Sequence, residues 1–72
     1  MGEIEPAVYH VVLDTGTGEW AVRKEGDSRN SGAYARKESA VRAAIYLAKK
    51  RPPCQVRIHG QDGTVLREHT YE

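Results

Sequence analysis

Residues 37–50 read KESAVRAAIYLAKK, and they carry the clearest structural pattern of the sequence. The apolar residues of this stretch fall on one arc of a helical wheel, and they are Ala40, Val41, Ala44, Ile45, Leu47 and Ala48. Two prolines follow at residues 52–53, and proline cannot continue a helix. The pattern therefore predicts one amphipathic helix whose apolar face packs against the rest of the chain.

Extended segments precede and follow this helix. Residues 8–13 are rich in β-branched and aromatic side chains, and residues 19–24 alternate between the two sides of a strand. A turn with two glycines joins the two segments into a hairpin. Residues 54–59 alternate between inward and outward side chains, and residues 64–71 continue as a more polar strand after an Asp-Gly turn. Residues 25–33 are polar and contain glycine, so we predict a surface loop there.

The order of these elements predicts an α+β fold of the type ββαββ. We expect a four-stranded antiparallel sheet in the order 2-1-3-4, with the helix on one face. This order places the two most apolar strands in the centre and the polar strands at the edges. Residues 1–6 are expected to form a flexible N-terminal segment, and residues 7–72 a single domain. The side chains predicted to point inward are Tyr9, Val11, Leu13, Trp20, Val22, Val41, Ala44, Ile45, Ala48, Val56 and Ile58.

Composition narrows the class of protein. The chain has 72 residues with a net charge of +1, which argues against a dedicated polyanion binder. Its lone cysteine, Cys54, excludes an intrachain disulfide and favours a reducing compartment. No apolar run approaches the ~20 residues of a membrane helix, and the N-terminus does not resemble a signal peptide. We therefore expect a cytoplasmic protein without a membrane partner.

Four parts of the sequence resemble a known family. They are Tyr-His-Val-Val at residues 9–12, Trp-Ala-Val-Arg-Lys-Glu-Gly at residues 20–26, Ala40 with Ala44 and Leu47-Ala48 in the helix, and Val-Arg-Ile-His-Gly-Gln-Asp-Gly at residues 56–63. Together they resemble the short bacterial proteins grouped as domain of unknown function 2188, over nearly the whole chain. Arg36 departs from the pattern, since family members more often have threonine at the helix start. The resemblance implies a small stand-alone bacterial protein, and it implies no activity and no site residues.

The residues form no recognisable catalytic, cofactor-binding or metal-binding motif. His10 and His59 are predicted on neighbouring strands, both facing away from the helix, but no metal-ligand spacing accompanies them. We therefore favour plain surface histidines over a shared metal site. Cys54 alternates with Val56 and is expected to be a buried apolar residue. We predict a protein that is not an enzyme and that binds no cofactor or metal.

Two surfaces remain as candidate partner sites. The outer helix face is basic and carries Tyr46, a combination that suits phosphate contacts and base stacking. The alternative is a solvated face, which the small net charge favours. The open face of the sheet carries Val8 and Val12, which suit either a homodimer or, with the arginines there, a nucleic acid. The candidate contact residues are Arg36, Lys37, Arg42, Tyr46, Lys49, Lys50, Arg23 and Arg57.

These considerations lead to one main hypothesis and one alternative. The main hypothesis is a non-enzymatic binding or accessory protein that forms a homodimer, through Val8 and Val12 or through an exposed edge strand. The alternative is a nucleic-acid-binding module that uses the basic helix face or the open sheet face. Nucleic acid is therefore a partner that the sequence allows without favouring.

Overall fold

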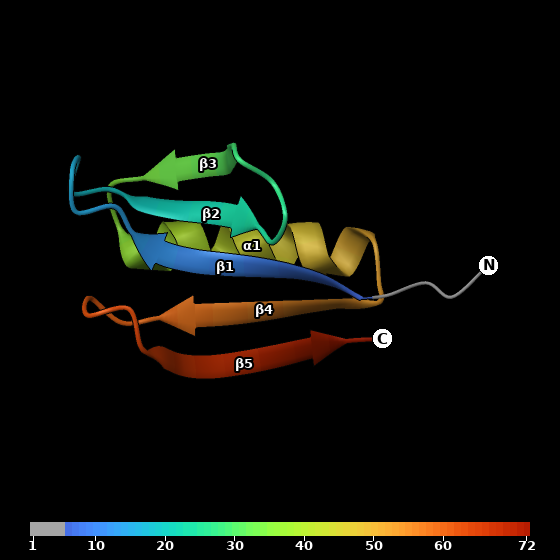
Figure 1. Cartoon of the computed structure of the whole chain (residues 1–72). Coiled ribbons are helices and arrows are strands. Elements are labelled where there is room, and N and C mark those ends of the chain that lie inside the picture. The colour runs from blue at the N-terminus through green and yellow to red at the C-terminus, as the bar shows by residue number, and fades with distance from the viewer. Residues whose placement is uncertain (1–5) are drawn as a thin grey trace.

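The computed structural model describes residues 6–72 of the chain and contains five strands and one helix (Figure 1). The elements in chain order are β1 (Ala7–Leu13), β2 (Trp20–Lys24), β3 (Asn30–Tyr34), α1 (Lys37–Lys50), β4 (Cys54–His59) and β5 (Val65–Tyr71). The segment predicted to be flexible, residues 1–6, lies outside the described residues except for Pro6. No helix within residues 6–72 has the length and apolar character needed to cross a membrane.

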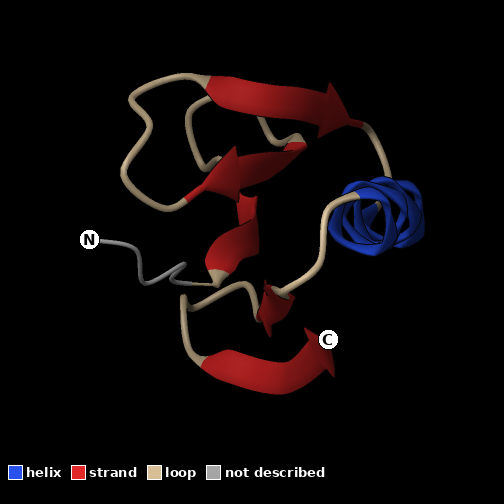
Figure 2. Ribbon diagram, turned by 90° about the vertical axis from the view of Figure 1, so that its right-hand side faces the viewer, coloured by secondary structure: helices blue, strands red, loops and turns tan. Residues whose placement is uncertain are grey.

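The strands form one mixed sheet in the order β3-β2-β1-β4-β5. The central pair, β1 and β4, is parallel, and every other neighbouring pair is antiparallel. The helix covers one face of the sheet and leaves the other face open (Figure 2). The predicted α+β class and the single helix on one face are therefore confirmed.

The predicted sheet of four antiparallel strands is wrong in two respects that have one cause. The last part of the predicted loop, residues 30–33, belongs with Tyr34 to the edge strand β3, so the strand order gains a member beside β2. Each hairpin reverses the chain direction, and this extra strand reverses it once more before the helix. The helix then returns the chain to the end of the sheet where β1 begins, and β4 runs parallel to β1. Recognising β3 would have corrected both points.

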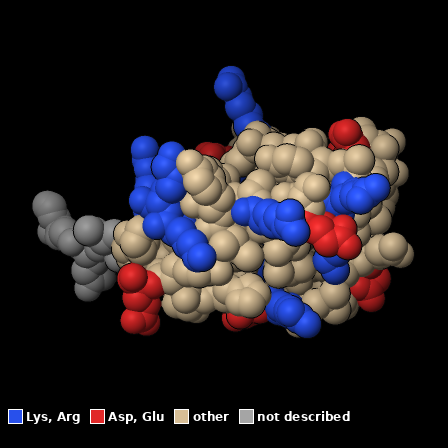
Figure 3. All heavy atoms as spheres, turned by 180° about the vertical axis from the view of Figure 1, so that it is seen from behind, with Lys and Arg blue, Asp and Glu red and all other residues tan. Residues whose placement is uncertain are grey.

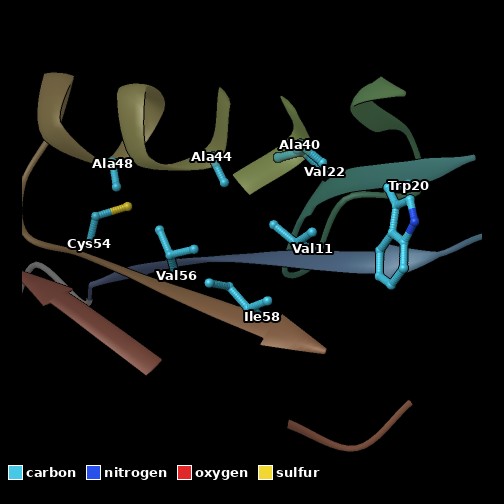
Figure 4. Packing of buried hydrophobic residues seen from close by; sticks show 9 residues of the cluster. All are labelled: Val11, Trp20, Val22, Ala40, Ala44, Ala48, Cys54, Val56 and Ile58. Carbon is cyan, nitrogen blue, oxygen red and sulfur yellow. The ribbon is translucent and has the colours of Figure 1, made fainter. Parts of the chain in front are cut away.

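Three alanines allow the helix to approach the sheet closely. Ala40, Ala44 and Ala48 are fully buried, and their methyl groups point from α1 toward the side chains of β1, β2 and β4 (Figure 4). The other members of this core are Val11, Trp20, Val22, Cys54, Val56 and Ile58. Tyr9, Leu13 and Val41 are only half-buried and pack around it.

Ile45 does not join the core as predicted. It is half-buried and stands apart from the buried cluster and the side chains packed against it. The reason is geometric, since residues at i and i+4 centre the contact stripe on the alanines and place Ile45 on its flank. The apolar arc read from the sequence is therefore wider than the face that the helix buries.

The helix does not extend over the whole sheet. It packs across β3, β2, β1 and β4, whereas β5 lies beyond its main contact area. At the start of the helix Arg36 occupies the N-cap position with extended backbone and makes no side-chain capping bond. Arg36, the residue that departs from the family pattern, therefore leaves the helix without a side-chain cap. The limited reach of the helix leaves the helix-facing side of β5 accessible.

Candidate functional site

A groove of about 500 Å³ lies between the first half of α1 and the outer strand β5. Its apolar lining comes from Val41, Ile58 and Leu66, which belong to the helix, β4 and β5 respectively. The groove follows from the placement of the helix, because α1 covers β4 and leaves β5 without a covering layer. The result is an open apolar channel beside an edge strand.

An irregularity in the sheet shapes one wall of this groove. The β4–β5 register shifts after Ile58, so that Ile58 pairs with Arg67 and His59 pairs with Val65. Leu66 is the extra residue of this β-bulge, and it lines the groove with 57% of its surface exposed. Arg67 shares the sheet face of its partner Ile58, so its side chain borders the groove.

Basic side chains surround the apolar floor. Lys37 and Arg42 of the helix and Arg67 of β5 line the groove, and Glu38 is the one acidic residue in the lining. Arg67 was not among the residues predicted to contact a partner. Its alternation with the inward-facing Tyr71 could have revealed its side of the sheet, but the polar character of this strand masked the signal.

Charge is strongly segregated in the molecule. Residues 36–51 hold six of the eleven basic residues and one of the ten acidic ones, which gives this segment a net charge of +5. The rest of the chain holds five basic and nine acidic residues, a net charge of −4. Figure 3 shows the helix side of the molecule, where Lys and Arg gather most densely toward the end of α1. The overall charge of +1 therefore conceals a distinctly basic face.

Tyr46 provides an exposed aromatic surface on this basic face. Its side chain is 62% exposed, and the Lys50 ammonium lies 5.2 Å from the centre of its ring. Arg42 and Lys49 are also exposed on the helix. Proteins that bind single-stranded nucleic acids use exposed aromatic rings to stack with bases and nearby cations to contact phosphates.

The candidate contact residues do not all lie on one surface. Arg36, Lys37, Arg42, Tyr46, Lys49 and Lys50 all belong to the helix segment. Arg23 and Arg57 lie on the opposite, open face of the sheet, as predicted. Arg23 donates a hydrogen bond from Nε to Asn30 Oδ1 at 3.0 Å. The structure thus divides the eight residues into a helix-face group of six and an open-face pair.

Arg57 is held by side chains on neighbouring positions of the open face. Its terminal nitrogen donates to Gln55 Oε1 at 3.4 Å, and its Nε lies 3.8 Å from Glu68 Oε2. The Nε atom is buried without a hydrogen-bond partner. Arg57 therefore supports the sheet surface more than it extends into solvent.

The same open face brings two predicted neighbours into direct contact. His10 Nδ1 lies 2.9 Å from His59 Nε2, and the two ring centres are 5.1 Å apart with the planes tilted by 47°. The prediction that these residues share a face on adjacent strands is confirmed. Glu25, in the β2–β3 turn, lies 2.9 Å from His10 Nε2 and was not singled out from the sequence. Among residues 6–72 no three His, Cys, Asp or Glu side chains cluster as a metal site.

Two acidic side chains, those of Asp14 and Asp62, support turns of the backbone. Asp14 Oδ1 accepts a hydrogen bond from the Gly16 amide at 2.9 Å. Asp62 Oδ1 accepts two hydrogen bonds from Thr64, and these bonds lower the pKa of the Asp62 carboxyl. Cys54 is buried as expected, and its loss of contact with water raises the pKa of the thiol.

Comparison with known families gives a match that spans most of the chain. Residues 9–71 match DUF2188, a family described as uncharacterised proteins conserved in bacteria. The chain belongs to this family. The resemblance noted in the sequence of this DUF2188 domain is therefore confirmed. Searches of curated proteins and of solved structures gave no match.

Proposed function

We propose that this DUF2188 domain is a non-enzymatic binding protein whose helix face takes a single-stranded nucleic acid. The observation that carries the proposal is the charge segregation, with +5 on the sixteen-residue helix segment and −4 on the remainder. A phosphodiester chain is the polyanion that such a stripe attracts, because each phosphate contact releases a condensed counterion. The small net charge, which favoured a solvated face, does not describe this local surface.

The apolar and aromatic features of the face favour single strands over a duplex. Tyr46 is exposed on the helix, and the neighbouring groove has Val41, Ile58 and Leu66 in its lining. Unpaired bases can stack on an exposed ring and occupy an apolar channel, whereas paired bases keep their faces inside the duplex. Lys37, Arg42 and Arg67 border the channel and are placed to contact phosphates.

Fluorescence anisotropy with a labelled oligothymidylate of about 12 nucleotides tests this proposal. We expect binding that weakens as salt rises from about 50 to 200 mM, with a log–log slope near −3 for roughly four phosphate contacts. A duplex of the same length should bind more weakly. Absence of binding at low salt, or binding indifferent to salt, would contradict the proposal.

Matched double variants locate the binding surface. Arg42→Gln with Lys49→Gln removes two exposed charges from the helix face. Arg23→Gln with Arg29→Gln removes two charges from outside the helix segment and gives the same net charge. We expect a loss of affinity of about tenfold for the first pair and about twofold or less for the second. Equal losses would show that only total charge matters and that the helix face is not the site.

A second candidate function, self-association, rests on strand β5. This strand is the last in the sheet, and it carries Val65 and Leu66 with 46% and 57% of their surfaces exposed. An exposed edge with apolar side chains is a surface on which a second copy can add its own edge strand. Val8 and Val12 on the open face are half-buried, so β5 is the stronger of the two dimer surfaces first considered.

Sedimentation velocity between about 10 and 500 µM tests self-association. We expect the sedimentation coefficient of the native chain to rise with concentration. For Leu66→Lys we expect it to stay at the value of the monomer. Tyr46→Lys places the same charge at an exposed helix position and should leave the association intact. A native chain that stays monomeric at the highest concentration would rule out the homodimer.

A further inference from the structure

Four polar groups form a continuous chain across the open face of the sheet. Glu25 Oε1 contacts His10 Nε2 at 2.9 Å, His10 Nδ1 contacts His59 Nε2 at 2.9 Å, and His59 Nδ1 contacts the Gly63 carbonyl oxygen at 3.0 Å. This series of contacts begins in the β2–β3 turn, passes through β1 and β4, and ends in the β4–β5 turn. It lies on the side of the sheet opposite the helix and its groove.

The two ends of this chain fix where protons must be. A backbone carbonyl only accepts hydrogen bonds, so His59 Nδ1 must carry a proton to donate to Gly63. An ionised carboxylate also only accepts, so His10 Nε2 must carry a proton to donate to Glu25. If each ring were neutral, its single N–H proton would thereby be placed, and His10 Nδ1 and His59 Nε2 would face each other with lone pairs.

Two facing lone pairs 2.9 Å apart repel, whereas a proton between them makes a hydrogen bond. We propose that His10 and His59 share one additional proton and form a proton-dependent clasp between the β2–β3 and β4–β5 turns. The pair then carries one positive charge, which the Glu25 carboxylate balances. Loss of the shared proton forces at least one ring to turn and releases its hold on Glu25 or Gly63.

The charged neighbours on this face are accounted for by other contacts. Arg23 on β2 and Arg57 on β4 are the cross-strand partners of His10. Arg23 is bonded to Asn30, and Arg57 lies beside Gln55 and Glu68. The Glu25 carboxylate is therefore the acidic group in direct contact with the imidazole pair.

The distance favours a proton over a metal ion. Two imidazole nitrogens bound at about 2.0–2.1 Å to one tetrahedral metal would lie about 3.3 Å apart, which is longer than the separation here. Within residues 6–72 no third His, Cys, Asp or Glu completes a metal-binding cluster with them. A metal ion is thus an outcome that the test distinguishes.

Long-range ¹H–¹⁵N spectra of the imidazole nitrogens, recorded across about pH 5 to 8 and beyond, test the clasp. We expect the shared proton to couple the two rings, so that the signals of His10 Nδ1 and His59 Nε2 change together. His69, on the helix side of β5, serves as the internal reference because it is not part of the pair. With His10→Gln, the His59 signals should lose this coupled change, whereas His69→Gln should alter neither ring.

Signals of His10 and His59 that change independently, and that are unaffected by substitution of the other ring, would overturn the proposal. So would stoichiometric zinc that gives the paired nitrogen signals only in its presence and loses them with a chelator. Glu25→Gln offers a second variant in case His10→Gln fails to fold, and it should weaken the coupling between the two rings, because it removes the carboxylate that balances their positive charge. Because the clasp lies on the opposite face, these outcomes do not depend on oligonucleotide binding.

Discussion

The Lys37 ammonium lies 5.2 Å from the centre of the Trp20 ring, where the first turn of the helix meets β2. Trp20 lies at one end of the core and is only 9% exposed (Figure 4). Arg36 gives this helix no side-chain cap, and a cation near a helix N-terminus is unfavourable to the dipole. The ring face offsets that cost through a cation–π contact, so Lys37 helps to fix the start of the helix.

Removing this cation should therefore destabilise the fold. We expect Lys37→Gln to lower the free energy of unfolding by about 0.5 kcal/mol, because the lost cation–π contact outweighs the relief at the helix dipole, and we expect Lys37→Arg to retain most of the contact. Urea unfolding followed by the fluorescence of Trp20, the single tryptophan, measures the difference. Arg42→Gln is the control, because it removes an exposed charge from the middle of the helix, where the dipole has little effect. Equal effects of the two glutamine variants would mean that the contact with Trp20 contributes nothing.

Helix α1 and strand β3 illustrate how much of the fold the sequence could predict. Helix α1 begins and ends at the predicted residues, because apolar spacing and two prolines define it locally. Strand β3 was missed because Asn30, Ser31 and Gly32 have weak strand propensity and no apolar alternation. Its pairing with β2 comes from the neighbouring strand's unsatisfied backbone groups, which a local pattern does not reveal. The parallel β1–β4 pair depends on that strand and was lost with it.

Some residues of the candidate sites could likewise be predicted from the sequence, and others could not. Alternation along β1 and β4 was enough to place His10 and His59 on one face, and the basic helix face was visible in the sequence. The contact of Glu25 with His10 was not predicted, because the position of Glu25 depends on the β2–β3 turn. That turn can be placed only when β3 is recognised as a strand. Arg67 was missed because the polar character of β5 hid its alternation with Tyr71, and the β-bulge at Leu66 was not predicted either. Contacts made across irregular backbone remained beyond sequence patterns.

The alanine stripe predicts a strong dependence on side-chain volume. Ala44 is fully buried between the helix and the sheet, so a larger side chain there must displace its neighbours. We expect Ala44→Leu to lower the free energy of unfolding by about 1–3 kcal/mol, because overpacking distorts a filled core. Ser39→Leu adds the same side chain at an exposed helix position and should have little effect. Urea unfolding of both variants checks the result, and similar stabilities would refute close packing at Ala44.

The Asp62 carboxylate gives the β4–β5 turn a defined response to acid. Thr64 donates its hydroxyl at 2.8 Å and its amide at 3.1 Å to Asp62 Oδ1, and these bonds lower the pKa of the carboxyl. Because the folded-state pKa is depressed, the stabilisation is full above the ordinary pKa of aspartate and is lost as the pH falls through the folded-state value. The turn should therefore loosen only in strong acid.

Removing the hydroxyl donor tests that assignment. Thr64→Val should raise the pKa of Asp62 toward its ordinary range, because the hydroxyl bond is the largest cause of the shift. An NMR titration of the Asp62 carboxyl carbon measures the change. Thr70→Val, at another exposed position of the same hairpin, should leave the Asp62 titration unaltered. An unchanged pKa in Thr64→Val would mean that the amide bond alone holds the carboxylate.

Cys54 should be protected from thiol reagents by the fold. It is only 1% exposed, and burial raises the pKa of its thiol, although the Gln55 amide and the charge of Lys24 oppose the shift. The reactive thiolate is therefore both inaccessible and disfavoured. Because the folded-state pKa is raised, the stability from this group is full below the ordinary thiol pKa and is lost as the pH rises through the folded-state value.

The rate of reaction with a disulfide reagent such as DTNB measures this protection. At about pH 8 we expect the native thiol to react on the order of a hundredfold more slowly than in denaturant, since reaction requires the helix to open from β4. A chain with Cys54→Ala and Ser28→Cys places the thiol in the exposed β2–β3 turn and should react at nearly the unfolded rate. If native Cys54 reacts as fast as this control, the helix does not stay closed over the end of β4. The buried thiol would then be a property of a minor arrangement of the chain.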